Sequence, residues 1–327
     1  MQTTDPSHRA GQHAVILDLA RFGPDTIFSP VPLAQARIYC KSLAKKHYEN
    51  FSVASLMVPR LIRQDFYNIY AFCRWSDDLA DELDSPQDSA QLLTWWHGEL
   101  HRCFRGEAEH PVFVALNDTR IRHQLRVEPF DDLIDAFVQD QTVFRYETNR
   151  ELLDYCARSA NPVGRILLRT GKVEPEQAIE FSDKICTGLQ IANFCQDIRR
   201  DASIGRIYLP RERWGGCDLD ENQILSGTAS PGLIRALRDW VQYARGLILG
   251  GLPLAQYCPR WLARDVQLFA RGGLTILRNI EMAGFDVWSR PIRVSKSQKL
   301  GLLLRAIIQP RSINYRPHSK LYESASE

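Results

Sequence analysis

Two groups of acidic residues have a spacing that would place metal-binding carboxylates on helices. In the first group, Asp77 and Asp81 lie four residues apart, and Arg74 precedes Asp77 by three. Steps of three and four residues return to the same face of a helix, so the two carboxylates would lie one turn apart and repel each other. A hard cation would relieve this repulsion, and Mg²⁺ typically binds one or two carboxylates together with substrate phosphates. Alone, such a motif is more often an acidic, solvated helix end.

The second group of polar residues favours a metal site over a solvated helix end, because it supplies a second helix with the same spacing of carboxylates. Gln190, Asn193, Asp197 and Asp201 follow one another at steps of three, four and four residues and would form one polar stripe. If buried, each amide or carboxylate left without a partner costs about 1–3 kcal/mol. Two such helices that face each other around Mg²⁺ would form a site for a diphosphate leaving group. The cations would neutralise the charge that develops as the C–O bond breaks.

The elements that must position these groups are predicted to be helices. From Leu33 onward, apolar residues recur at helical spacing, and turn signals interrupt them at 84–86, 161–162, 215–216 and 230–232. The best strand-like run is 206–210, and Pro210 truncates it. We therefore predict an all-α, single-domain chain of ten or more helices. A catalytic domain over residues 31–300 would follow a loosely ordered lead-in (1–30) and precede a basic C-terminal tail (301–327).

Composition narrows the function classes. The chain has 327 residues, 44% of them hydrophobic, and a net charge of +2, which argues against a dedicated nucleic-acid-binding protein. Eight cysteines without paired spacing indicate reduced thiols, and we expect no pair at metal-ligand spacing among the eight histidines. The longest uncharged stretch, 246–259, is too short to span a membrane, and the N-terminus lacks the pattern of a secretory signal. These features predict a cytoplasmic protein without a transmembrane segment.

The C-terminal end is strongly basic. Residues 290–320 contain eight Lys and Arg and no Asp or Glu, with Leu and Ile residues among them. One interpretation is a solvated basic tail. The other is peripheral contact with an anionic membrane surface, such as the inner membrane, which a lipid substrate would favour.

The motifs, in their order along the chain, resemble those of the squalene/phytoene synthase family from about Leu33 to Leu300. They are His47-Tyr-Glu-Asn-Phe51, Tyr70-Ala-Phe-Cys-Arg74 with Asp77-Asp78-Leu-Ala-Asp81, Tyr155-Cys with Pro162-Val-Gly164, Gln190-Ile-Ala-Asn193 with Asp197 and Asp201, Gly205-Arg-Ile-Tyr-Leu-Pro210, and Asp286-Val-Trp-Ser-Arg290 with Val294-Ser-Lys296. Each piece is weak alone, and the ordered set is specific.

The resemblance implies an isoprenoid synthase fold, a helical bundle around a central apolar pocket, and a Mg²⁺-bound prenyl diphosphate. It implies metal ligands at Asp77, Asp81, Asn193, Asp197 and Asp201, and diphosphate-binding arginines at Arg74 and Arg290. It also implies pocket or diphosphate contacts at His47, Asn50, Phe51, Tyr70, Tyr155, Gln190 and Tyr208. The four aspartates, Tyr70 and Tyr155 form the implied catalytic set. Aromatic residues among these either pack in the core or shield an allylic cation.

Two departures from the family pattern make the chain resemble its hydroxysqualene synthase branch, found in bacterial hopanoid pathways. Gln196 stands where carotenoid-type members have Arg, and Gly273 stands where many members have Tyr. The branch implies presqualene diphosphate as substrate and water as the trapping nucleophile. One alternative is head-to-head condensation of farnesyl or geranylgeranyl diphosphate to presqualene diphosphate, squalene or phytoene. Another is a non-catalytic helical protein that binds metal or a membrane, which the joint presence of both acidic motifs and the arginines disfavours.

Overall fold

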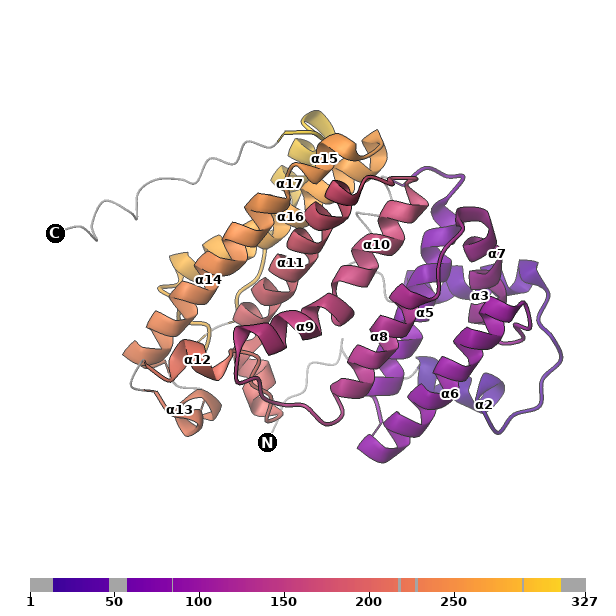
Figure 1. Ribbon diagram of the computed structural model, residues 1–327, viewed down its shortest axis with the longest axis horizontal. Helices are drawn as coiled ribbons and strands as arrows, with labels where there is room; N and C mark the ends of the chain where they lie inside the picture. Colours follow the sequence, from indigo (N-terminus) through magenta and orange to yellow (C-terminus); the bar gives the residue numbers. More distant parts are fainter. Residues whose placement is uncertain are drawn as a thin grey trace.

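The chain folds into two groups of α-helices that lie side by side (Figure 1). The computed structural model describes residues 14–46, 58–83, 85–216, 219–226, 229–289 and 291–312. The first group contains α2 (Ala14–Phe22), α3 (Leu33–Lys46), α5 (Arg63–Asp81), α6 (Pro86–Arg105), α7 (Pro111–His123) and α8 (Glu128–Gln139). The second contains α9 (Asn149–Ser159), α10 (Asn161–Thr170), α11 (Glu176–Ser203), α12 (Arg211–Trp214), α13 (Glu221–Leu225), α14 (Pro231–Gly251), α15 (Leu254–Tyr257), α16 (Arg260–Met282) and α17 (Lys296–Ile308). The all-α prediction is confirmed.

The core of the first group is aromatic and fixes the orientation of α5. Trp75 stacks on Trp96 with ring centroids 5.0 Å apart, and Phe72 meets Phe130 edge-on at 5.1 Å. Phe72, Trp75 and Leu79 are fully buried and lie on one face of α5. At about 100° per residue, Arg74, Asp77 and Asp81 fall on the opposite face. Burial of the aromatic face therefore turns the acidic motif away from this core.

The second group is built around the long helices α11, α14 and α16, which pack against one another. Glycines allow this close approach. A Cβ at Gly188 would lie 2.7 Å from Ile248 Cγ1, and one at Gly251 would lie 2.4 Å from Ile185 Cγ1. Ile191, Cys195 and Ile198 of α11 are buried, whereas the polar stripe of α11 is centred about 120° away around the helix. The second motif is therefore positioned in the same way as the first.

Helices α8, α9 and α10 connect the two groups (Figure 1). Helix α8 contacts α5 and α6 on one side and α9 and α10 on the other, while α9 and α10 also contact α11. The C-terminal end of α8 and the segment between α8 and α9 consequently lie between the two acidic helices.

Local signals account for several helix boundaries. Ser85 caps α6, Ser230 caps α14, and Thr148 forms a capping box with Glu151 at the start of α9. The predicted interruptions near 85, 161, 215 and 230 all coincide with helix ends. Within the described residues, the strand-like run 206–210 contributes one isolated parallel bridge between Arg145 and Ile207.

The two ends of the chain differ from the simple expectation. Residues Ala14–Phe22 form α2, where Val15 is buried and Asp18 accepts a hydrogen bond from Tyr39 at 2.7 Å. This part of the predicted loose lead-in is therefore packed, because α2 covers the aromatic core of the first group. At the other end, α17 crosses the predicted boundary at residue 300. None of the helices in the described ranges is long and apolar enough to cross a membrane.

Candidate active site

The first acidic motif occupies the last two turns of α5. Arg74 lies between two carboxylates: its Nη1 is 3.3 Å from Asp77 Oδ2, and its Nη2 forms an ion pair with Asp78. Asp78 is fully buried, Asp77 is 46% exposed, and Asp81 is exposed. Asp78 thus forms a buried ion pair with Arg74, while Asp77 and Asp81 face outward and lie one helical turn apart. Tyr70 lies on the same face and is partly buried.

Burial makes two carboxylates of this motif, those of Asp77 and Asp78, unusually hard to ionise. It raises the pKa of Asp77 to about 6, with a further contribution from the nearby Asp81 carboxylate. Burial raises the pKa of Asp78 to about 7, although Arg74 opposes this shift. Burial therefore has a larger effect on the pKa values of Asp77 and Asp78 than the charge of Arg74.

The second motif is the polar stripe of α11. Asn193 is exposed, and Gln190, Asp197 and Asp201 are partly buried along the same face. Burial, followed by the charge of Asp197, raises the pKa of Asp201 to about 7. Burial also raises the pKa of Asp197. Burial is thus the main cause of the raised pKa values on both helices.

The structure brings the two motifs together around Asp140, which directly follows α8. Asp140 interacts electrostatically with Asp77 and Asp81 of α5, and Asp201 of α11 interacts with Asp140 in turn. Arg206 donates a hydrogen bond to the Asp140 backbone carbonyl at 3.0 Å and interacts with Asp81. Carboxylates from α5, from the residue after α8 and from α11 therefore converge on one region.

A buried aromatic cluster adjoins these carboxylates. Phe194, next to Asn193 on α11, stacks on Tyr208 with ring centroids 4.0 Å apart and planes 8° from parallel. Tyr155 of α9 and Tyr146 lie within 6.0 Å of the Tyr208 ring centroid. The Tyr155 hydroxyl donates to Asp140 Oδ2 at 2.9 Å. Polar and aromatic surfaces thus meet at Asp140.

Motif spacing did not reveal Asp140, Arg206, Tyr146 or Phe194 as members of this region. Arg206 lies inside the Gly205–Pro210 motif and could have been recognised there, whereas Asp140 ends a helix and has no motif around it. Four of the predicted site residues lie outside the described ranges: His47, Asn50, Phe51 and Arg290. Their assignment stays a prediction.

The two departures from the family pattern have clear structural surroundings. The Gln196 side chain is about 100° around α11 from Asp197 and donates to the Ile292 carbonyl at 2.9 Å. It therefore ties α11 to the segment before α17. A Cβ at Gly273 would lie 2.4 Å from Leu189 Cδ2. Close packing of α16 on α11 thus leaves little room for a side chain at 273.

The predicted metal ligands suit a hard divalent cation. They are four carboxylates and one amide, all oxygen donors, of the type that Mg²⁺ prefers. Among the described residues, buried Asp140 Oδ1 has no hydrogen-bond partner, and burial raises the pKa values of Asp77 and Asp201 because it disfavours their charged forms. Divalent cations at Asp77, Asp81, Asn193, Asp197 and Asp201 would stabilise the charged forms of these carboxylates.

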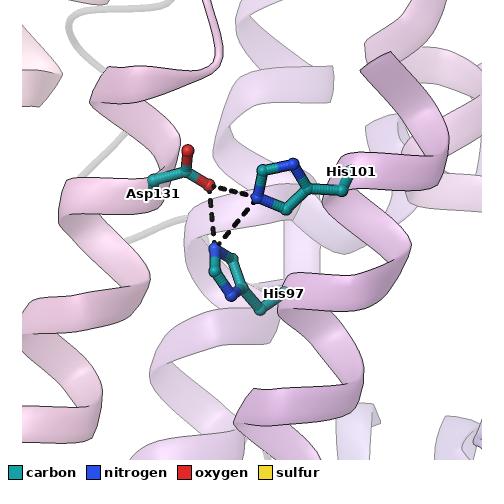
Figure 2. Close-up of side chains that lie close together, drawn as sticks. All are labelled: His97, His101 and Asp131. Atoms are coloured by element: carbon teal, nitrogen blue, oxygen red, sulfur yellow. Dashed lines mark hydrogen bonds and ion pairs between the residues drawn. The ribbon is translucent and has the colours of Figure 1, made fainter. Parts of the chain in front are cut away.

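The expectation about histidine was wrong. His97 and His101 lie one turn apart on α6, and Asp131 of α8 reaches both (Figure 2). The i, i+4 spacing is visible in the sequence, but the carboxylate that completes the group comes from another helix. This cluster lies outside the region of the two acidic motifs.

Comparisons with known proteins identify the fold and the family of the chain. Its fold is that of the isoprenoid synthases of the squalene synthase type. The squalene/phytoene synthase family model matches residues 44–298, and the chain belongs to this family.

Three relatives illustrate the similarity. The solved structure of squalene synthase HpnC from Alicyclobacillus acidocaldarius is 41% identical, with a TM-score of 0.75, over 78% of this chain and 97% of that chain. The presqualene diphosphate synthase of Zymomonas mobilis is 31% identical over 78% of this chain and 86% of the relative. The 15-cis-phytoene synthase of Synechococcus elongatus is 27% identical over 85% of this chain and 94% of the relative.

Proposed function

We propose that the protein is a Mg²⁺-dependent enzyme that converts presqualene diphosphate and water into hydroxysqualene and diphosphate. The observation that carries this proposal is the convergence of two aspartate-bearing helices beside a buried aromatic cluster. Such a region combines an environment for a charged leaving group with an apolar one for a carbocation. One similar protein is named for presqualene diphosphate and another for squalene, which supports a substrate of the same series.

The diphosphate end of the substrate would bind between α5 and α11. Asp77, Asp81, Asn193, Asp197 and Asp201 would hold the cations, which when bound would offset the charge of the departing diphosphate. Arg74 is oriented by its contacts with Asp77 and Asp78 and would add a fixed guanidinium, a group suited to phosphate oxygens. Arg290 would add a second guanidinium, as the family resemblance implies.

The hydrocarbon end would lie against the aromatic cluster. Electron-rich ring faces stabilise a nearby cation by about 0.5–2 kcal/mol each, the upper value applying when water is excluded. Tyr155 and Tyr208 are almost completely buried, and burial raises the pKa of both hydroxyl groups. Both therefore stay protonated, so neither presents a phenolate that would attack the cation.

The proposed reaction needs no reductant. The C–O bond to the diphosphate breaks, and its electron pair leaves with the diphosphate. The cyclopropylcarbinyl cation then opens to an allylic cation. The oxygen of a water molecule adds to this cation and loses a proton, which gives hydroxysqualene.

A product assay separates this proposal from the head-to-head condensation of two prenyl diphosphates. The protein would be supplied with Mg²⁺ but no NADPH, in parallel with presqualene diphosphate and with farnesyl diphosphate. Hydroxysqualene from the first, with the second unconsumed, is the expected result. Consumption of farnesyl diphosphate would instead show a condensing enzyme and would contradict the weight given to Gln196 and Gly273. Close packing at Gly273 and the bond of Gln196 to Ile292 favour the first outcome, because neither position offers a group to a second diphosphate.

Substitution of the acidic motifs tests the same site. Asp81→Ala or Asp197→Ala should lower kcat by roughly 100-fold or more, the effect typical of losing one electrostatic contact to a developing charge. Asp88→Ala is a matched control, because Asp88 is exposed in the first turn of α6, the helix that follows the motif in sequence. Circular dichroism should show unchanged helix content in all three variants. Unchanged turnover in Asp81→Ala and Asp197→Ala would remove the metal assignment.

A peripheral membrane contact through α17 is a further part of the proposal. Leu300, Leu304 and Ile308 lie along one exposed face of this helix, and Lys296 and Lys299 are exposed beside them. Apolar and basic residues in this arrangement favour binding to an anionic surface. Cosedimentation with vesicles should increase with anionic lipid content, and binding that is independent of anionic lipid would contradict this part.

A further inference from the structure

Two histidines and one aspartate on the first helix group converge on a single point. His97 Nε2 lies 2.9 Å from Asp131 Oδ1, His101 Nε2 lies 3.1 Å from the same oxygen, and the two Nε2 atoms are 3.2 Å apart. Figure 2 shows the three side chains pointing toward one another, the histidines from α6 and the aspartate from α8. The donors therefore form a nearly equilateral triangle.

Hydrogen bonding alone does not account for all three contacts. A neutral imidazole carries one N–H, and a carboxylate oxygen only accepts. If both Nε2 atoms carry protons, both bond to Asp131 Oδ1, and the two N–H groups then oppose each other across 3.2 Å. If only one Nε2 carries a proton, that N–H can make one good hydrogen bond, and at least one of the other two contacts has no donor. In either case one close contact between polar atoms stays unsatisfied.

A single metal ion satisfies all three contacts at once. Ligands at about 2.0–2.1 Å from a tetrahedral zinc are separated from one another by about 3.3 Å. The separations of 2.9, 3.1 and 3.2 Å are close to this value, so the helices need hardly move. The side chains of His97 and His101 are 38% and 42% exposed, which leaves water access to a fourth position.

We propose that His97, His101 and Asp131 form a surface site for a divalent transition-metal ion, with Zn²⁺ as the representative ion. Two imidazole nitrogens and one carboxylate suit Zn²⁺ and its neighbours in the first transition row, whereas Mg²⁺ prefers oxygen donors. The site is also separate from the acidic motifs. Asp131 precedes Asp140 by nine residues, which corresponds to about 14 Å along α8.

The structural consequence of binding is a link between α6 and α8. Both helices pack against α5, which bears the first acidic motif. A bound ion would join two elements that otherwise meet through side-chain packing, so occupancy should raise the temperature of unfolding. The site requires no prenyl substrate, and its failure or success does not depend on the proposed reaction.

Metal titration of the full-length protein tests this inference. Zn²⁺ would be titrated calorimetrically in buffer with excess Mg²⁺, which occupies oxygen-donor sites. Co²⁺ would be added separately, because its visible absorption reports the ligands directly. The expected result is one equivalent of Zn²⁺ in the wild type that is lost in His97→Gln and in His101→Gln. Loss of a direct ligand should weaken binding by at least the roughly 10–100-fold that loss of an outer-shell partner costs.

Matched variants make the outcome decisive. Asp132→Asn removes the neighbouring carboxylate of α8 and should leave this binding unchanged, whereas Asp131→Asn should weaken it. The side chains of His97 and His101 are only partly buried, so glutamine at either position should cost little stability, and circular dichroism should confirm that each variant folds. Wild-type protein without this equivalent, or equal Zn²⁺ affinity in the wild type and both histidine variants, would overturn the proposal. Binding lost in Asp81→Ala but retained in His97→Gln would also overturn it, by assigning the ion to the acidic motifs.

Discussion

The hydrogen bond between Tyr155 and Asp140 offers a quantitative test of the candidate site. The two side chains are 3% and 9% exposed, so neither has much water to replace a lost partner. Tyr155→Phe removes the 2.9 Å bond to Asp140 Oδ2 while keeping the ring in the aromatic cluster. A hydrogen bond to a charged group contributes about 1.5–3 kcal/mol, and one between neutral groups about 1 kcal/mol. The substitution should therefore cost about 2 kcal/mol whenever Asp140 is ionised.

The cost should depend on pH in a defined direction. Burial raises the pKa of Asp140 to about 6, and the Tyr155 bond works against this rise. The folded state thus binds more protons than the unfolded state between about pH 4 and pH 6, so the contribution of Asp140 to stability falls as pH rises through this window. Tyr155→Phe raises the pKa further and extends this loss to higher pH. We expect a destabilisation of about 2 kcal/mol at pH 8 and about 1 kcal/mol at pH 5.

Urea unfolding followed by tryptophan fluorescence measures both values. Asp140→Asn is the matched control, because the amide oxygen still accepts from Tyr155 but carries no charge. In that background Tyr155→Phe should cost about 1 kcal/mol at both pH values, which leaves a coupling of about 1 kcal/mol at pH 8. A cost below about 0.5 kcal/mol at pH 8, or equal costs at both pH values in the wild-type background, would refute the described role of this pair.

Three further predictions concern stability. Asp65 is fully buried and accepts a hydrogen bond from Arg122 at 2.8 Å. Asp65→Ala should lower the free energy of unfolding in urea by about 3 kcal/mol, which is the lower end of the range for a buried ion pair because Arg122 is 38% exposed. A loss below about 1 kcal/mol would contradict this role of Asp65. Burial raises the pKa of Asp265 to about 8, so its contribution falls by up to about 1.4 kcal/mol per pH unit between about pH 4 and pH 8. Asp265→Asn should therefore stabilise at pH 8.5 but not at pH 4, and a variant with the same pH dependence of thermal unfolding as the wild type would refute this. Gly272→Ala should stabilise the fold by about 1 kcal/mol, because the new Cβ meets no described atom within 4 Å. Gly273→Ala should not give this stabilisation, because its Cβ would clash with the Leu189 side chain. Equal effects of the two substitutions on the free energy of unfolding would contradict the close packing at Gly273.

Local chemistry in the sequence determined the secondary structure and the polarity of its faces. Apolar residues at three- and four-residue steps determine which side of α5 and α11 is buried, and that choice places Asp77 and Asp197 on the other side. Ser85 and Ser230 cap α6 and α14 through local bonds, because each side chain accepts a hydrogen bond from the backbone N–H three residues later. Such caps do not depend on the tertiary structure. The fold class and the two acidic motifs could accordingly be predicted from spacing alone.

Only the tertiary structure decided what those faces meet. Asp140 has no motif around it and becomes part of the site because α8 ends between α5 and α11. Asp131 reaches His97 and His101 because α8 packs on α6. Asp78 and Asp77 are neighbours with the same side chain, yet one is buried against Arg74 and the other faces outward. Contacts between helices far apart in sequence depend on the summed packing of both cores, and no local pattern encodes that sum.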